Sequence, residues 1–174
     1  MDIKSELKYG FWMAFALFIW WVVEYMLGWQ IPDTDLNFYS SIYSNLIVSV
    51  VGLFLVMLVK KQQLPSGEVK YGTLAISGGI ALLAAGILLI PLASIFFHFI
   101  NQEWVELGVE KALEKLDENA TKEEIVKMTE RAESYYAPSS MGMTSFSKLI
   151  MMGFFLVLAE ALIVLKLPIG TGSK

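Results

Sequence analysis

The sequence predicts an all-α integral membrane protein with four transmembrane helices and an extracytoplasmic amphipathic helical hairpin between helices three and four. The first observation behind this fold class is composition. Of 174 residues, 56% are hydrophobic and 17% are charged, against roughly 45–50% and about 25% in soluble proteins. The second observation is that the apolar residues form four long stretches, and the third is an alternating charge pattern between them. A disordered chain is excluded, because disorder needs few apolar residues and a high net charge. So much apolar surface could not all be hidden from water on so short a chain, which argues against a soluble globule.

The four predicted spans belong to a single membrane domain that covers residues 1–174. They run over residues 9–29, 42–59, 74–100 and 146–167, and each is close to the ~20 residues that a spanning helix needs. They are too long for strands, and no apolar–polar alternation occurs in them. The first stretch exceeds the ~7–15-residue core of a signal peptide, and no A-x-A cleavage site follows it. We therefore interpret it as a retained span.

The placement of basic residues predicts the orientation of these spans. The N-terminal tail, the connection between spans two and three and the C-terminal tail contain Lys4, Lys8, Lys60, Lys61, Lys70, Lys166 and Lys174. The connection QIPDTDLNFYS between spans one and two has no basic residue, and residues 101–143 contain ten acidic and five basic residues. Both termini are thus expected in the cytoplasm. Lys148 is compatible with this orientation, because it can snorkel to the outer interface from the start of span four.

Residues 101–143 predict two amphipathic helices that form a hairpin. Apolar residues recur at helical spacing in the first helix at Val105, Val109, Ala112, Leu113 and Leu116, and in the second at Ile125, Met128, Thr129, Ala132 and Tyr136. Thr121 and Glu124 have the spacing of a capping box, and Pro138 is expected to stop the second helix. Such a hairpin covers the helix ends of its own protein, or it provides a docking surface for another protein.

Span three contains two packing features. Pro91 removes a helical hydrogen bond, so we expect a kink near residues 87–91. Ser77, Ala81 and Ala85 repeat every fourth residue, and a face of such small residues allows another helix to approach closely.

Two acidic residues, Glu24 and Glu160, lie inside spans, where a charge costs roughly 3 kcal/mol on insertion scales. His98 lies near the outer end of span three, within predicted hydrogen-bonding reach of Glu24. These three polar intramembrane residues have two interpretations. They bond helices together, or they form a proton or cation relay. No arginine or lysine is expected deep in any span, where it would bind an anionic substrate.

Other classes of chemistry find no support in the sequence. The chain has no cysteine and one histidine, which excludes Cys-ligated metal sites and multi-histidine centres. Its net charge of −4 argues against nucleic acid as a partner. We find no nucleotide-binding loop and no hydrolase or metalloprotease motif. The sequence therefore predicts no catalytic residue, no cofactor site and no metal site.

The order of motifs is similar to that of a known family. LKYGFWMAFALFIWWVVEYMLGW opens the chain, and VKYGTLAISGG leads into span three, which ends with FFHFIN. A TKEEIVKM helix follows, and ALIVLK closes span four. In these segments the chain resembles an uncharacterised family of bacterial four-helix membrane proteins, domain of unknown function 4199. The resemblance implies the fold and a location in the inner membrane of a Gram-negative bacterium, and it implies no activity, substrate or cofactor.

These observations together predict a non-enzymatic inner-membrane protein that binds other membrane proteins or itself within the lipid bilayer. It would be an accessory or scaffolding subunit of a membrane protein assembly, or a homo-oligomer. The alternative is a small proton or cation transporter, or a channel component, that uses Glu24, His98 and Glu160.

Overall fold

The computed structural model describes residues 3–117 and 119–168, and every regular element in these residues is helical. The elements in chain order are α1 (Lys4–Met26), α2 (Asp35–Gln63), the 3-10 turn η1 (Ser66–Glu68), α3 (Tyr71–Ile95), the π-helical turn η2 (Phe96–Ile100), α4 (Trp104–Leu113), α5 (Lys122–Tyr136) and α6 (Pro138–Lys166). Four of them are long and apolar enough to cross a membrane: α1, α2, α3 together with η2, and α6. This confirms the four predicted apolar helices.

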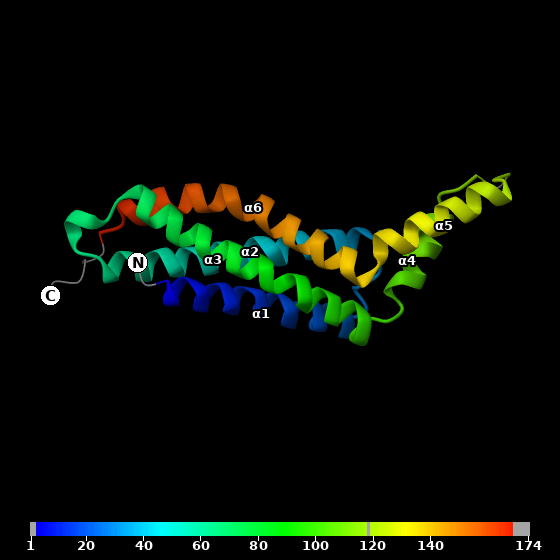
Figure 1. The fold of residues 1–174 in the computed structure, drawn as a ribbon, viewed down its shortest axis with the longest axis horizontal. Helices are drawn as coiled ribbons and strands as arrows, with labels where there is room; N and C mark the ends of the chain where they lie inside the picture. Colours follow the sequence, from blue (N-terminus) through cyan, green and yellow to red (C-terminus); the bar gives the residue numbers. More distant parts are fainter. Residues whose placement is uncertain (1–2, 118, 169–174) are drawn as a thin grey trace.

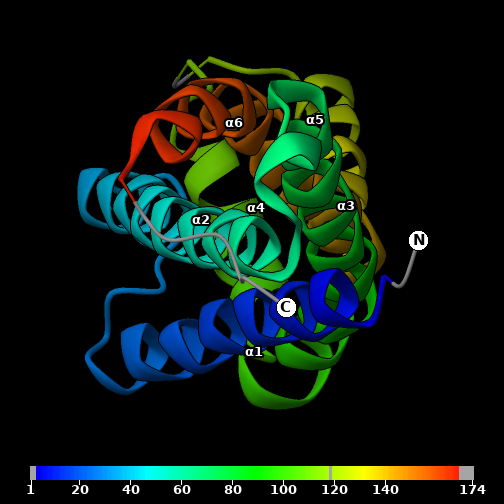
Figure 2. The ribbon, with the colours of Figure 1, turned by 90° about the vertical axis from the view of Figure 1, so that its left-hand side faces the viewer.

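The four long helices lie side by side along the long axis of the molecule (Figures 1 and 2). The start of α1 and the end of α6 lie at one end, which we call the termini end (Figure 1). At the opposite end, α4 and α5 pack against each other and project beyond the bundle. We call this the hairpin end. The molecule therefore has two ends of different construction, joined by an apolar middle.

Two helices extend past their predicted spans at the hairpin end. α2 begins at Asp35 instead of residue 42, because the Thr34 side chain accepts a hydrogen bond from the Asn37 backbone N–H and caps the helix. α6 begins at Pro138 instead of residue 146. Pro138 does follow the end of α5, as predicted, but a proline is also well suited to the first turn of the next helix. Each extension adds about two turns of helix.

The predicted small-residue face is fully buried: Ser77, Ala81 and Ala85 are inaccessible. α1 approaches α3 closely here, since a Cβ added to Gly10 would lie 2.7 Å from the Ala81 carbonyl oxygen. The α-helix continues through the exposed Pro91 to Ile95, and the irregular geometry follows at η2.

Large apolar side chains cover the sides of the bundle. On α1 and α6 alone, the exposed ones include Phe11, Trp12, Ile19, Phe154, Phe155 and Ile163. Such a surface is unfavourable in water and is the normal surface of a helix bundle that contacts lipid tails. The burial pattern thus agrees with the composition in favouring a membrane protein.

Candidate functional site

At the termini end, buried charges are paired with each other. Glu6 is fully buried, and its carboxylate forms an ion pair of 2.8 Å with the Lys60 ammonium. It also accepts hydrogen bonds from the hydroxyls of Ser5 at 2.7 Å and Ser77 at 3.1 Å. Sequence reasoning missed Glu6, because this residue precedes the apolar run and is counted with the tail. The cluster joins α1, α2 and α3.

Lys61 caps the C-terminal end of α6. Its ammonium donates to the carbonyl oxygens of Val164 at 2.9 Å, Leu165 at 3.0 Å and Leu167 at 2.7 Å. The last carbonyls of a helix have no partner within the helix and carry partial negative charge, so a lysine is well suited to them. Lys60 and Lys61 are both buried, although the sequence analysis places them in the connection between spans two and three and uses them only as charges of that loop.

Glu24 is the buried acid of the hairpin end. Its carboxylate accepts hydrogen bonds from Trp20 Nε1 at 2.6 Å, from the Gln30 side-chain amide and from the Ser40 hydroxyl. It therefore joins α1, the connection that follows it and α2. The predicted Glu24–His98 hydrogen bond is absent. His98 is exposed instead, and its ring packs edge-on against Phe99 at a centroid distance of 4.5 Å.

Glu160 is buried without a partner. It is 5% exposed, and neither carboxylate oxygen has a hydrogen-bond partner among residues 3–117 and 119–168. It lies near the end of α6 at the termini end, whereas Glu24 lies near the end of α1 at the hairpin end. The structure thus places Glu24, His98 and Glu160 in three separate environments.

The hairpin is well packed at its root and exposed toward its tip. A Cβ on Gly108 of α4 would lie 2.4 Å from the Tyr136 ring, so these helices are in close contact. Trp104 and Tyr136 are buried and meet edge-on, with ring centroids 6.0 Å apart. The capping box of Thr121 and Glu124 is present as predicted. Ile125, expected on the buried stripe, is 40% exposed, because the distal part of α5 extends past the bundle (Figure 1).

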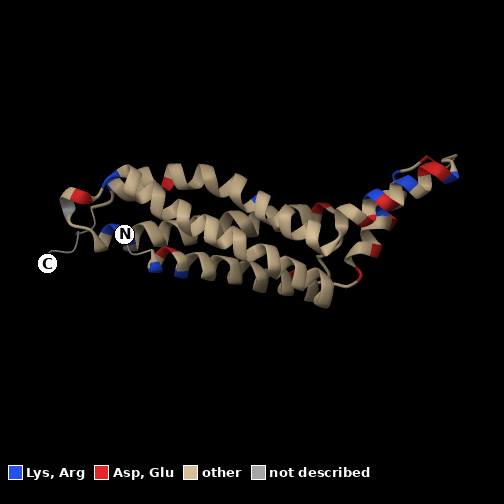
Figure 3. Ribbon diagram, in the orientation of Figure 1, with Lys and Arg blue, Asp and Glu red and all other residues tan. Residues whose placement is uncertain are grey.

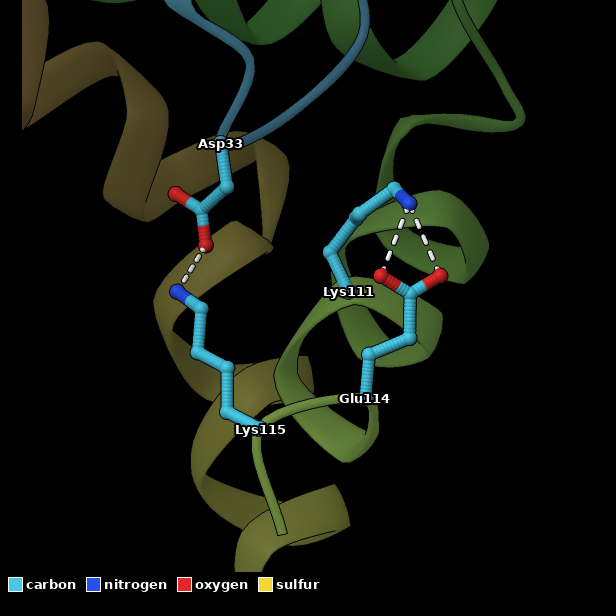
Figure 4. Close-up of polar contacts among 4 residues, drawn as sticks. All are labelled: Asp33, Lys111, Glu114 and Lys115. Atoms are coloured by element: carbon cyan, nitrogen blue, oxygen red, sulfur yellow. Dashed lines mark hydrogen bonds and ion pairs between the residues drawn. The ribbon is translucent and has the colours of Figure 1, made fainter.

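Charged residues of the hairpin form two ion pairs (Figure 4). Lys111 binds both carboxylate oxygens of Glu114 at 2.8 Å within the hairpin. Lys115 binds Asp33 of the α1–α2 connection at 2.6 Å and so ties the hairpin to the bundle. The hydrogen bond from Lys115 lowers the pKa of Asp33. Burial, together with the nearby Asp33, raises the pKa of Tyr136 to about 12. Charged residues are concentrated along the hairpin and at the termini end (Figure 3).

Two adjoining cavities lie between the hairpin root, α2 and α6. The outer cavity has a volume of about 440 Å³ and is lined by Asp33, Thr34, Asp35, Asn37, Phe38, Trp104, Lys115, Tyr135, Tyr136, Met141, Thr144 and Lys148. The inner one, of about 50 Å³, is lined by Trp21, Gln30, Asn37, Ser41, Asn45, Phe97, Trp104, Met141, Thr144, Ser145 and Lys148. Five residues line both cavities: Asn37, Trp104, Met141, Thr144 and Lys148. We call the two together the hairpin-end cavity.

Lys148 is the basic residue of this cavity that has no acidic partner. Among the residues that the structure describes, no carboxylate lies within 4.0 Å of its ammonium. The sequence predicts Lys148 at the start of span four. Because α6 begins at Pro138, Lys148 lies instead ten residues into the helix. Lys148 is exposed at the surface of the structure. Trp104 Nε1, by contrast, is buried and has no acceptor in the described part of the chain. Sequence reasoning missed this cavity, because it is built from the two unpredicted helix extensions and the hairpin root.

Residues 3–117 and 119–168 contain no group of three or more histidine, aspartate or glutamate side chains that is arranged to hold a metal ion. The site that the geometry does offer is the hairpin-end cavity, which is lined by hydroxyl and amide side chains, two lysines and two aspartates.

Comparison with known proteins gives one result. No curated protein and no solved structure shows significant similarity to the chain. A family model, described as a protein of unknown function (DUF4199), matches residues 8–166, which is nearly the whole chain. The chain therefore belongs to this family.

Proposed function

We propose that this protein is a non-enzymatic, multi-pass protein of the bacterial inner membrane, and that it acts by binding other proteins. It would serve as an accessory or scaffolding subunit of a membrane protein assembly, or as a homo-oligomer. The observation that supports this function is the hairpin of α4 and α5, which projects past the bundle. A hairpin that only covered the helix ends of its own bundle would have no reason to extend beyond them.

The hairpin combines a fixed root with an available tip, as a docking element requires. The root is fixed by the Trp104–Tyr136 contact, by close packing at Gly108 and by the Lys115–Asp33 ion pair. Toward the tip, Ile125 and Val126 are 40% and 56% exposed, among charged residues of α5. Apolar side chains surrounded by polar ones are typical of protein interfaces.

The orientation that goes with this proposal has both termini in the cytoplasm and the hairpin outside it. Its support is the placement of lysines in the tails and in the connection between α2 and α3, together with the acidic hairpin. A reporter active only outside the cytoplasm should be active when fused after Asp117 and inactive when fused after Lys61. The opposite result would reverse the orientation.

Cross-linking from the tip tests the docking role. A photoreactive amino acid at Val126 should yield a specific adduct in intact cells, and the same group at the buried Ala132 should not. Val126→Asp should release the partner during purification in mild detergent, whereas the exposed Glu123→Gln, as a control, should retain it. An adduct between two copies of the chain would identify the homo-oligomer. Recovery of a lone monomer, with no adduct from Val126, would contradict the proposal.

A second candidate function, the proton or cation relay, has one supporting observation, which is the unpartnered carboxyl group of Glu160. A relay predicts a pH-dependent ion flux in reconstituted vesicles that is lost in Glu160→Gln and kept in Glu123→Gln. The docking proposal predicts no such flux in either variant.

A further inference from the structure

Two residues that line the hairpin-end cavity have hydrogen-bond donors without a partner in the described ranges. Lys148 has no carboxylate partner in the described ranges, and the buried Trp104 Nε1 has no acceptor there. A tryptophan N–H and a lysine ammonium only donate. The hydroxyl of Thr144 and the amide of Asn37 line the same two cavities. The unpaired buried N–H of Trp104 costs about 1–3 kcal/mol, and an anion that accepted a hydrogen bond from it would remove this cost. Lys148 is exposed, so its ammonium can be reached by the same anion.

The acidic residues near the cavity do not neutralise Lys148. Asp33 is paired with Lys115 at 2.6 Å. Asp35 lies in the first turn of α2, where the helix dipole favours a negative charge. Glu24 already accepts three hydrogen bonds, one of them from Gln30, which lines the inner cavity. Each carboxylate has its own compensation, so the charge of Lys148 remains available to a ligand.

The position of Lys148 along α6 matches the depth of lipid headgroups. It precedes Lys166, the last residue of α6, by 18 positions, or about 27 Å of helix, and the hydrocarbon core is about 30 Å thick. If the termini end of α6 lies at one boundary of the core, Lys148 lies close to the other. A lysine near the end of a spanning helix can extend to the interface, where it reaches the phosphate of a lipid headgroup.

We propose that the hairpin-end cavity is a binding site for a phosphate group, held by Lys148 and Trp104 with Asn37 and Thr144 as further donors. Its source is a membrane lipid headgroup or a phosphate compound from the aqueous phase. A tetrahedral anion with several oxygens fits donors that come from three separate elements, α2, α4 and α6. The outer cavity, of about 440 Å³, has room for a phosphate and the group that carries it. This site is independent of the docking role proposed for the hairpin tip.

Thermal unfolding of the full chain in an uncharged detergent tests this site. The probes are dihexanoyl phosphatidic acid, inorganic phosphate and uncharged dihexanoylglycerol. A ligand that binds only the folded state raises the unfolding midpoint in a concentration-dependent way. Phosphatidic acid should raise it, and dihexanoylglycerol should not. A rise with inorganic phosphate as well would indicate a site for aqueous phosphate, and a rise with phosphatidic acid alone a site for lipid headgroups.

Variants decide whether the cavity is responsible. Lys148→Gln should weaken binding of phosphatidic acid about tenfold, and Trp104→Phe, which keeps the ring and loses the N–H, about fivefold. Lys148→Arg keeps the cation and should bind within about threefold of the parent. Lys127→Gln, which changes an exposed lysine of α5, is the matched control and should not change binding. Equal binding by Lys148→Gln and the parent, or an equal rise with dihexanoylglycerol, would overturn the proposal, as would the absence of any rise.

Discussion

The two ends of the bundle use similar residues in opposite ways. At the termini end, Lys60 and Lys61 both have partners within the protein, since Lys60 pairs with Glu6 and Lys61 binds three carbonyls at the C-terminal end of α6 and just after it. At the hairpin end, Lys148 lines a cavity and has no described carboxylate partner. A charge with saturated partners holds helices together, whereas one with unused bonding capacity is free to bind a ligand.

The three buried acidic residues, Glu6, Glu24 and Glu160, also differ in their partners. At the hairpin end, Glu24 accepts bonds from three side chains, and at the termini end Glu6 has Lys60 and two serines. Of these three buried acids, Glu160 is the one that has no hydrogen-bond partner among the described residues. Substitutions of these residues should therefore differ in sign as well as in size. The four predictions below begin with the largest effect.

Lys60→Met should cause the largest loss of stability. It leaves the carboxylate of Glu6 buried without its cation, and breaking a buried pair from one side costs about 3–5 kcal/mol. The free energy of unfolding in detergent measures this loss. Lys8→Met, which removes an exposed lysine of α1, is the control and should change stability by less than about 0.5 kcal/mol. A similar small change for Lys60→Met would show that this end does not depend on the ion pair.

Glu160→Leu should stabilise the protein by about 1 kcal/mol. It removes a buried polar group that has no described partner, and such a group costs about 1–3 kcal/mol. Glu6→Leu, in the same assay, should have the opposite sign, because it leaves Lys60 without its ion-pair partner Glu6. A marked loss of stability in Glu160→Leu would reveal a partner for this residue and would remove the contrast among the acids.

Glu24→Gln should change the free energy of unfolding by less than about 0.5 kcal/mol, whereas Glu24→Ala should cost about 0.6 kcal/mol per lost bond and up to about 2. The glutamine oxygen can accept from Trp20 and Ser40, and its amide can donate to Gln30 once the Gln30 amide has turned over. A large loss in Glu24→Gln would mean that the negative charge itself is required at the hairpin end.

The sequence predicted local features of the molecule better than contacts between its elements. Long apolar stretches and the Thr121–Glu124 capping box each depend on residues that are close in sequence, and both are present. The onset of α2 and α6 was missed, because a Thr34 cap and a helix-opening Pro138 have little weight beside the hydropathy of the spans. The partner of Glu6 is a lysine on another helix, and the environment of Lys148 depends on three elements. Only the tertiary fold determines which of these charges is paired.

Asp33→Asn should have a small effect on stability, and it separates the two ion pairs of Figure 4. The Asp33 and Lys115 side chains are 36% and 64% exposed, and such a pair contributes at most about 1 kcal/mol. Its effect should appear in hydrogen-exchange protection at the hairpin root.

Because Lys115 lowers the pKa of Asp33, the contribution of the pair is complete above the unfolded pKa of about 3.9 and is lost as the pH falls through the lower folded value. Tyr136, whose pKa is raised to about 12, should weaken the root only as the pH rises from about 10 toward that value. Lys111→Gln, which breaks the pair inside the hairpin, should leave the protection of the root unchanged at every pH. Equal protection in Asp33→Asn and the parent between pH 5 and 8 would show that the aromatic contacts alone hold the hairpin to the bundle.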